Sequence, residues 1–389
     1  MERLWNGNYL KVFAGNFMIF FSFYLIMAVL PLYVSDTYHA DKGMIGVVLS
    51  GYTLTAMAAR SAGGYLADSY RRKTVLMAFY ALFFLFFFGY LLTWPIVIFA
   101  ALRTAHGIPF GALTVTSSAM AVDVLHPSRR AEGIGYYGLS NNLAMATGPA
   151  LGLFLYRALP DAKWLFVMSI VASGIGLAID SSISSPGNLP ARREPVALGR
   201  FFLLKGMRLA LSMALLSFGF GVCNNYLAIY TRDELGTTSS AGTFFIIVAA
   251  GLIASRLIGA RSLRQGRVTR NASAGVLLSL AGYTLFAAAQ HPAAYYATAA
   301  LIGLGNGFIF AAFFNMCINL APDSQRGAAN STLLTSWDVG MGLGVLLGGA
   351  IVEAAGYRCV FAVSAAVNAL GVAVFFLWGR PHFLANRLR

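Results

Sequence analysis

Long apolar runs constrain this chain more than any other feature of its sequence. Twelve runs reach about twenty residues or more, and a helix of that length, rising 1.5 Å per residue, crosses the roughly 30 Å hydrocarbon core of a bilayer. Only 11% of the 389 residues are charged, against about 25% in soluble domains. The sequence therefore predicts an all-α membrane protein with spans at residues 12–35, 43–66, 74–93, 96–123, 133–156, 163–183, 207–230, 241–260, 272–290, 293–320, 328–352 and 359–378.

The distribution of Lys and Arg predicts how the chain is oriented in the bilayer. With the N-terminus placed in the cytoplasm, the inner segments hold twenty of these residues and the outer loops hold five. Cytoplasmic loops of membrane proteins carry such an excess. We therefore expect a multi-pass protein of the plasma membrane (the cell inner membrane) with both termini in the cytoplasm. The net charge of +14 then reflects topology, and nucleic acid is not an expected partner.

The two halves of the chain share an internal repeat. Residues of the first half recur 196 positions later, in the corresponding run and on the same membrane side. The matched pairs are Arg60 and Arg256, Gly63 and Gly259, Gly107 and Gly303, Gly111 and Gly307, Arg130 and Arg326, Gly148 and Gly344, and Gly152 and Gly348. Such a register predicts parallel repeats related by an axis along the membrane normal. We expect two pseudo-symmetric six-helix bundles, residues 1–183 and 207–389, joined by a cytoplasmic linker at 184–206.

Enzymatic and cofactor chemistry finds no support in the sequence. The three cysteines lie in or beside apolar runs and form no Cys/His cluster, so no metal or disulfide framework is expected. The sequence has no His-Glu-x-x-His, Gly-x-Ser-x-Gly or phosphate-loop motif. A membrane enzyme is therefore disfavoured, and a sensor would normally need an extra-membrane domain. We expect a protein that is not an enzyme and that needs no cofactor.

The segment 64–73, between the second and third runs, carries a Gly, an Asp four residues later and then a basic cluster. This pattern resembles the signature loop of the major facilitator superfamily. It departs from the family at Ser69 and Arg71, where a basic residue and a Gly are usual. The resemblance implies a cytoplasmic ionic latch, and a basic loop that only sets topology is the alternative. The residues assigned to this gating loop and its network are Gly64, Asp68, Arg71, Arg72, Lys73, Arg60 and Arg130.

Two further motifs carry the resemblance. Arg103 and His106, followed by Gly107 and Gly111, resemble the family's Arg-containing motif, with His106 where Gln is common. The fifth run follows the spacing of a motif associated with drug/proton antiporters at Gly135, Ala144, Gly148, Pro149 and Gly152. The resemblance implies two bundles with alternating access to a central cavity, and export of small organic compounds in exchange for protons. Proton-linked uptake of a sugar or small metabolite is the alternative.

An ionisable group inside a span raises the free energy of membrane insertion by about 2.5–3.5 kcal/mol, so its presence there indicates function. Arg103, His106 and Asp338 lie deep in their runs, and none has a charged counterpart in the repeat. We predict that Asp338 or His106 takes up and releases a proton, with Arg103 as a fixed counter-charge. The alternatives are a structural carboxylate, a neutral hydrogen-bonded histidine and a structural cation bonded to backbone carbonyls.

Substrate contacts are predicted on the runs that face the cavity in this fold. Aromatic and amide groups with one cation would suit amphipathic or weakly anionic organic compounds better than inorganic ions, although ordinary amide bonding between helices would use the same residues. Besides the substrate, the expected partners are protons and the lipid bilayer, and we expect a functional monomer. The predicted cavity residues are Asn16, Phe20, Tyr24, Phe110, Asn224, Asn225, Asn306, Phe310 and Asn315.

Overall fold

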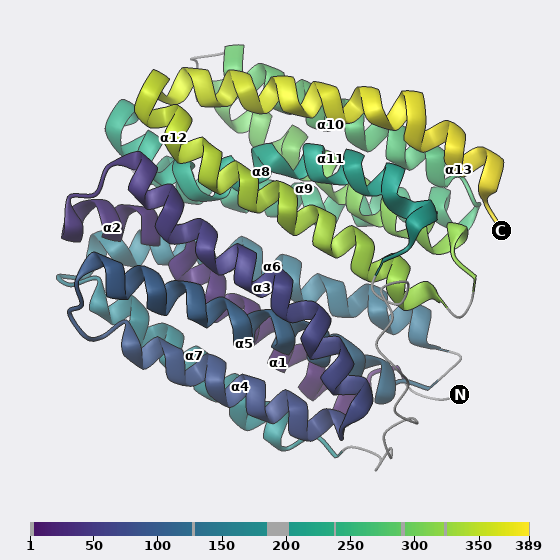
Figure 1. Ribbon diagram of the computed structural model, residues 1–389, viewed down its shortest axis with the longest axis horizontal. Coiled ribbons are helices and arrows are strands. Elements are labelled where there is room, and N and C mark those ends of the chain that lie inside the picture. The colour runs from purple at the N-terminus through teal and green to yellow at the C-terminus, as the bar shows by residue number, and fades with distance from the viewer. Residues whose placement is uncertain are drawn as a thin grey trace. The chain divides into compact units, whose positions relative to one another are not determined.

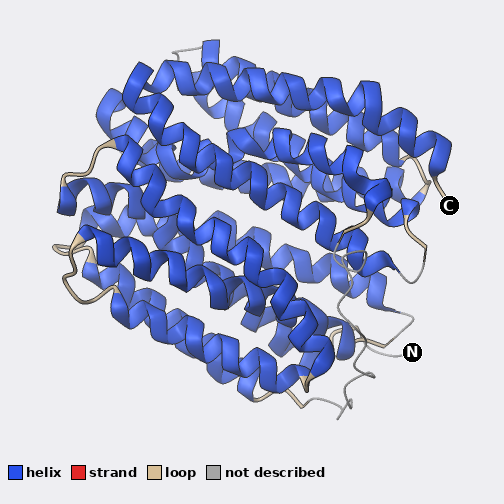
Figure 2. Ribbon diagram, viewed as in Figure 1, coloured by secondary structure: helices blue, strands red, loops and turns tan. Residues whose placement is uncertain are grey.

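The computed structural model describes residues 4–126, 129–184, 202–236, 239–288, 292–322 and 325–388. Within these ranges every regular element is a helix (Figure 2). A helix can cross the hydrocarbon core of a bilayer, because it satisfies all of its backbone hydrogen bonds within one segment. The predicted fold class, an all-α membrane protein, is confirmed.

The described residues of the first half form seven helices, which make six spans; Figure 1 shows their arrangement within this half. They are α1 (Gly7–Met27), α2 (Leu30–Tyr38), α3 (Lys42–Ser69), α4 (Arg72–Gly89), α5 (Ile96–Asp123), α6 (Arg130–Ala158) and α7 (Lys163–Ser181). Asn6 caps α1, because its side chain accepts a hydrogen bond from the Tyr9 N–H at 2.8 Å. Helices α1 and α2 together form one apolar span, Gly7–Tyr38.

The second half begins with a short 3₁₀ turn, η3 (Leu204–Gly206). Its helices are α8 (Met207–Leu235), α9 (Ser239–Arg264), α10 (Val268–Ala288), α11 (Pro292–Leu320), α12 (Arg326–Val374), the π-helical η5 (Phe375–Gly379) and α13 (Arg380–Asn386). Gly356 interrupts α12 with φ 79°, a left-handed conformation that glycine adopts without steric cost. Because of this break, α12 supplies two of the six spans in this half.

Two compact units emerge from the contacts between residues. Unit 1 comprises Met1–His39 and Gly51–Glu194, and unit 2 comprises Ala40–Ser50 and Pro195–Arg389. In unit 1, α1 packs on α6 and α7, and α4 packs on α5 and α7; in unit 2, α8 packs on α12, and α11 packs on α9 and α10. Of the predicted linker, residues 185–201 lie outside the described residues.

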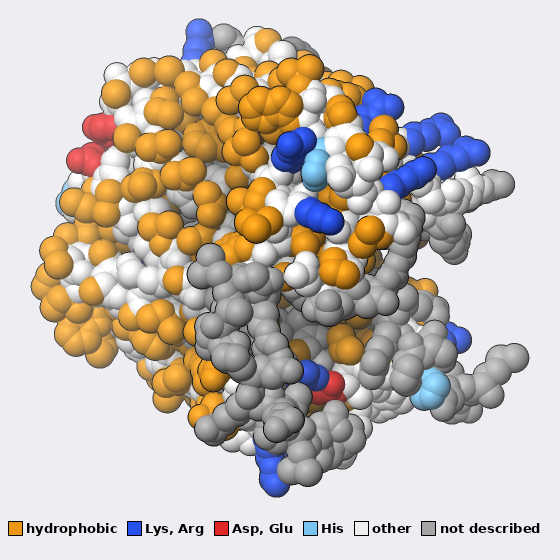
Figure 3. All heavy atoms as spheres, turned by 45° about the vertical axis from the view of Figure 1, so that its right-hand side comes forward, with side chains coloured by type: hydrophobic (Ala, Val, Ile, Leu, Met, Phe, Trp, Pro, Cys, Tyr) orange, Lys and Arg blue, Asp and Glu red, His pale blue; other side chains and the backbone are white. Residues whose placement is uncertain are grey.

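Nine segments of the described chain are long and apolar enough to cross a membrane. Helices α3 and α6 have 28 and 29 residues, enough to span, but their composition is less apolar. With the break in α12, they complete the twelve predicted spans. Val97 and Leu257 are 75% and 77% exposed, and hydrophobic side chains cover much of the face in Figure 3, while Lys and Arg gather toward one end of it. Such a surface is suited to lipid.

Equivalent glycines of the repeat have the same packing role in both units. A Cβ on Gly107 of α5 would lie 3.0 Å from the Tyr52 carbonyl carbon of α3, and a Cβ on Gly303 of α11 would lie 2.9 Å from the Val248 carbonyl carbon of α9. Glycine at these positions lets two helix backbones approach closely. The corresponding helix pairs therefore pack through corresponding residues, as pseudo-symmetric bundles require.

Candidate functional site

A buried arginine forms the centre of the candidate site in unit 1. Arg103 lies on α5 and is 3% exposed. Its guanidinium carbon lies 3.8 Å from the ring centroid of Tyr52 on α3 and 5.9 Å from that of Phe23 on α1, and such contacts attract a cation to the ring face. Among the described side chains, its Nε has no hydrogen-bond partner and no Asp or Glu forms an ion pair with it. Its charge is therefore not neutralised within the described part of the chain.

The hydrogen bonds of His106 identify its tautomer. Its Nε2 lies 3.1 Å from the Phe83 carbonyl oxygen, which only accepts, so Nε2 carries a proton. Its Nδ1 lies 2.9 Å from the hydroxyl of Tyr90, and that hydroxyl also accepts from Arg103 Nη1 at 3.4 Å. In the neutral ring Nδ1 accepts from Tyr90, and each group has a partner. Both ring nitrogens are occupied, and His106 as a proton carrier stays a prediction that mutation has to test.

Predicted cavity residues of the first and fourth spans lie together beside Arg103. The Phe110 ring stacks on Phe23 with centroids 4.6 Å apart and contacts the Phe20 ring edge-on at 5.7 Å. Phe20 in turn stacks on Tyr24 at 6.1 Å. Offset and edge-on contacts are the favoured arrangements of aromatic pairs. The structure thus places an aromatic wall next to the buried guanidinium.

Asn16 joins three helices through its amide. It donates to Ser140 Oγ on α6 at 2.6 Å and accepts from the Tyr137 hydroxyl at 2.7 Å, and that hydroxyl in turn accepts from Ser117 Oγ on α5 at 2.9 Å. Asn16 is 1% exposed. Amide bonding between helices, the alternative to substrate contact, accounts for both sides of this amide.

The candidate site in unit 2 surrounds Asp338 and Trp337 on α12. Asp338 is 8% exposed. The adjacent Trp337 carbonyl accepts from Ser217 Oγ on α8 at 3.0 Å. The Trp337 ring contacts Phe310 of α11 edge-on at 5.5 Å and Phe220 of α8 at 5.4 Å. Unit 2 therefore has an acidic residue adjacent in sequence to an aromatic cluster, at a position that the repeat pairs with Asn142 of unit 1.

The predicted asparagines of unit 2 differ in their surroundings. Asn224 and Asn225 are buried and each donates to a carbonyl one turn earlier on α8, at 3.0 Å. Asn315 is exposed and donates to the Ala311 carbonyl at 2.8 Å. Asn306, 1% exposed, has the Tyr283 hydroxyl as a polar neighbour, and neither amide atom makes a well-aligned hydrogen bond among the described residues. Of the four, Asn306 is the one whose amide has the most unused hydrogen-bonding capacity to offer a ligand.

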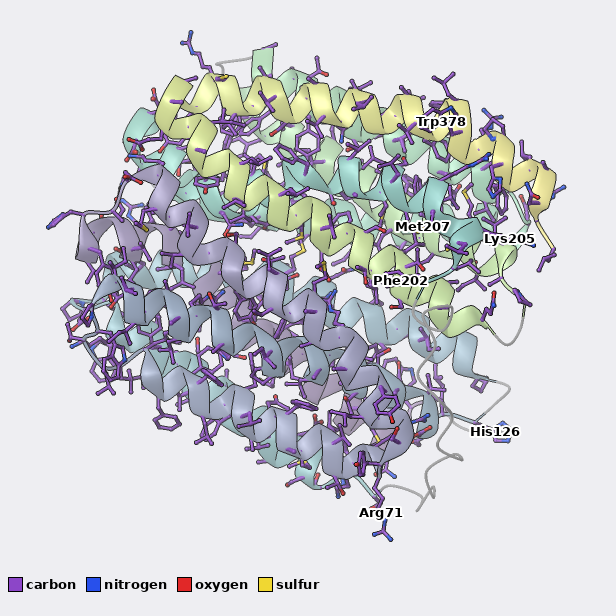
Figure 4. The ribbon with its side chains drawn as sticks, in the orientation of Figure 1. Arg71, His126, Phe202, Lys205, Met207 and Trp378 are labelled. Atoms are coloured by element: carbon purple, nitrogen blue, oxygen red, sulfur yellow. The ribbon has the colours of Figure 1, made fainter. Side chains whose placement is uncertain are left out.

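The predicted gating loop, residues 64–73, lies at one end of unit 1 and is mostly helical, because α3 continues to Ser69 and α4 begins at Arg72. Arg72 forms an ion pair with Asp123 at the end of α5, and Lys73 donates to carbonyl oxygens at the end of α7. Arg71 points away from the helices (Figure 4), and Gly64 and Arg60 lie within α3. The side chains of Asp68 and Arg130 lie outside the described ones, so the predicted latch stays a prediction.

The antiporter-like motif lies at the contact between α6 and α1. A Cβ on Gly148 would lie 2.6 Å from Tyr24 Cβ, and one on Gly152 would overlap the Leu25 carbonyl group. Ala144 between them is fully buried, and Pro149 lies inside the helix. Gly135 belongs to α6, and its surroundings lie outside the described part of the structure. The described members of the motif therefore set the packing of two helices.

Sequence reasoning missed one buried ionisable group. Asp180, in the last turn of α7, is 1% exposed, and neither of its carboxyl oxygens has a hydrogen-bond partner among the described residues. It stands near the end of an apolar run, where an acidic residue ordinarily reaches water. The signal that was available is helical periodicity, because Ser169 and Ser173 lie on the same face.

Comparisons with known proteins agree with this architecture. The family model described as Major Facilitator Superfamily matches residues 12–273 and 262–388. An uncharacterised MFS-type transporter of Salmonella typhimurium is 26% identical over 387 residues, covering 96% of both chains, and YhhS of Escherichia coli, described in the same way, is 26% identical over 393 residues, covering 96% of this chain and 92% of its own.

Solved structures share the fold at low sequence identity. The human organic anion transporter MFSD10 has a TM-score of 0.73 at 16% identity, covering 95% of this chain and 98% of its own. The peptide transporter POT in complex with sulfate has a TM-score of 0.78 at 14% identity, covering 96% and 95%. Since the family model spans most of the sequence, the chain belongs to the Major Facilitator Superfamily and is a multi-pass membrane transporter of small molecules, not an enzyme.

Proposed function

We propose that this transporter exports small amphipathic organic anions across the plasma membrane in exchange for protons, by alternating access and as a monomer. The observation that carries the proposal is Arg103, a buried guanidinium on an aromatic wall with no acidic partner among the described residues. A guanidinium presents paired N–H donors that match a carboxylate or similar anion. A substrate anion would supply the missing charge.

The aromatic residues beside Arg103 support the amphipathic part of the proposal. Phe20, Phe110 and Tyr24 provide apolar ring faces that stack on aromatic parts of a ligand. In unit 2, Phe310, Trp337 and the amide of Asn306, which makes no well-aligned hydrogen bond among the described residues, offer similar contacts. One similar structure is described as an organic anion transporter, which agrees with this substrate class.

Coupling to protons rests on the ionisable groups that lie deep in the spans. In the proposal Asp338 carries a proton in one half of the cycle, with His106 as the second predicted carrier, and Arg103 holds the substrate anion. Both termini lie in the cytoplasm, where the basic segments and the gating loop at residues 64–73 close the inner side. The loop's Asp68 would pair with a basic residue in the closed state.

The test measures accumulation of fluorescent probes in cells that express the protein. We expect wild-type cells to hold less carboxyfluorescein, an organic anion, than cells without the protein, and a protonophore to remove the difference. A rhodamine cation and a fluorescent glucose analogue are matched probes of other classes. Higher carboxyfluorescein in expressing cells would indicate uptake and refute export; transport of the sugar analogue alone would support proton-linked sugar uptake instead.

Arg103→Gln provides the residue-level test. It removes a buried charge that has no ion-pair partner among the described side chains, so we expect stability to be kept or raised. Carboxyfluorescein export should fall by about tenfold or more, an effect of about 1.4 kcal/mol on the transport step. Unchanged export in a folded Arg103→Gln protein would refute the role of this residue.

A further inference from the structure

Buried polar groups form a row along one face of α7. Ser169, Ser173 and Asp180 are separated by four and seven residues, which places them on the same face of the helix. They are 0%, 0% and 1% exposed. None of their side-chain oxygens has a hydrogen-bond partner among the described residues. Buried polar groups are usually paired, so a row of unpaired ones calls for a ligand, a proton or water.

Two glycines make room for this row. The Asp180 carboxyl group occupies the place where a Cβ on Gly15 of α1 would lie. One turn earlier, the Tyr80 hydroxyl of α4 occupies the place of a Cβ on Gly176 of α7. That hydroxyl also has no hydrogen-bond partner among the described residues. The polar row therefore extends from the serines past Tyr80 to the carboxyl group.

Helices α1, α4 and α6 pack against α7, and each brings an ionisable group toward the carboxyl. Lys11 of α1 and Lys73 of α4 donate to carbonyl oxygens of residues 181–183 at 2.6–2.8 Å. Tyr80 of α4 and Tyr137 of α6 interact electrostatically with the carboxyl group. Both ammonium groups thus bind the end of the helix rather than the carboxyl oxygens. A fixed negative charge here would lie unpaired at the negative end of the helix dipole.

We propose that Asp180 is a proton-binding residue of unit 1, reached along the row formed by Ser169, Ser173 and Tyr80. The carboxylate gains a proton to become a carboxylic acid and returns it, and no other bond changes. While Asp180 is protonated, Lys11 and Lys73 hold the end of α7; once it is ionised, it competes with the helix carbonyls for these cations. The inference rests on the proposed proton exchange, to which it adds a binding residue.

The first experiment needs no substrate. Purified full-length protein in lipid vesicles is titrated with pH while infrared difference spectra record the carbonyl stretch of protonated carboxyl groups. We expect a pH-dependent band that is lost in Asp180→Asn, while the band of Asp338, the other proposed carrier, remains in this variant. Asp123→Asn is the matched control, because Asp123 is a mostly buried aspartate held in an ion pair with Arg72, and the band should survive there. A band unchanged in Asp180→Asn would overturn the proposal.

The second experiment separates coupling from substrate movement. Vesicles are assayed with carboxyfluorescein for transport driven by a pH gradient and for exchange at equal pH. We expect Asp180→Asn to reduce gradient-driven transport by about tenfold while exchange stays within about twofold, a coupling loss in the usual range for linked sites. If the wild-type protein moves no probe, the proposed function fails, and the infrared band still decides Asp180. Equal loss of both modes in a folded variant would overturn the coupling role.

Tyr80→Phe provides a second test in case Asp180→Asn does not fold. It removes one hydroxyl without a hydrogen-bond partner among the described residues, so folding should be kept. We expect slower gradient-driven transport with exchange unchanged. If Asp180→Asn does not fold and Tyr80→Phe transports at the wild-type rate, the proposed path is overturned.

Discussion

The Tyr90 hydroxyl is the group whose removal tests the geometry around Arg103 most directly. In Tyr90→Phe, His106 Nδ1 loses the donor at 2.9 Å and Arg103 loses an acceptor at 3.4 Å, while the ring still fills its buried place. Leaving a buried polar atom unsatisfied costs about 1–3 kcal/mol, and hydrogen bonds between membrane helices are worth about 0.6–1.7 kcal/mol. The 3.4 Å contact is long and adds little. We therefore expect a loss of about 1–2 kcal/mol in the free energy of unfolding.

Tyr52→Phe is the matched control for this change. Tyr52 is also a buried tyrosine next to Arg103, but its hydroxyl has no hydrogen-bond partner among the described residues. The phenyl ring keeps the cation–π contact with the guanidinium. Stability should therefore stay the same or rise. Thermal or denaturant unfolding of both variants in the same detergent gives the comparison, and equal losses in the two would refute the assigned hydrogen bonds.

Three further predictions concern packing and the asparagines. Gly111→Leu should destabilise unit 1 by about 1–3 kcal/mol or prevent folding, because the leucine side chain would overlap the Ala56 carbonyl of α3. Gly138→Ala is the control, because a Cβ on Gly138 would have no atom within 4 Å. The yield and monodispersity of the two purified variants are compared. Gly356→Ala should cost about 1–2 kcal/mol, because φ 79° is strained for alanine, and a Tm equal to the wild-type value would contradict this. Asn306→Leu should keep stability but reduce transport, whereas Asn16→Leu should lose stability, because of the two only Asn16 forms well-aligned hydrogen bonds among the described residues. Loss of stability in Asn306→Leu and loss of transport alone in Asn16→Leu would refute these roles.

The architecture was predictable because a bilayer leaves few solutions. Helix length, apolar composition and the repeat offset each follow from physical constraints on a span, and the structure confirms the fold class they indicate. The break in α12 at Gly356 falls in the predicted loop between the last two runs. Helix α3 is harder to recognise, because residues such as Arg60 and Gly63 lower its apolar character while it still packs as a span.

The candidate site was predictable only in part. Arg103 and His106 stand out because charge inside an apolar run is rare. Their partners are ordinary residues of other helices, and Tyr52, Tyr90 and Phe83 become recognisable only once the chain is folded. Asp180 shows most clearly what the sequence could not predict. Its position near the end of an apolar run indicated contact with water, but tertiary packing around Gly15 buries its side chain.

The repeat separates what packing requires from what transport requires. Shifted by 196 positions, Gly107 and Gly111 recur as glycines, but Arg103, His106 and Tyr90 are replaced by Ala299, Ile302 and Phe286, which are also buried. Unit 2 thus builds the same helix contacts with an apolar set, so the fold does not need the polar one. Carrying a buried charge without structural need costs free energy. That asymmetry is the physical reason to seek substrate and proton binding in the groups that the repeat does not share: Arg103 and Asp180 in unit 1 and Asp338 in unit 2.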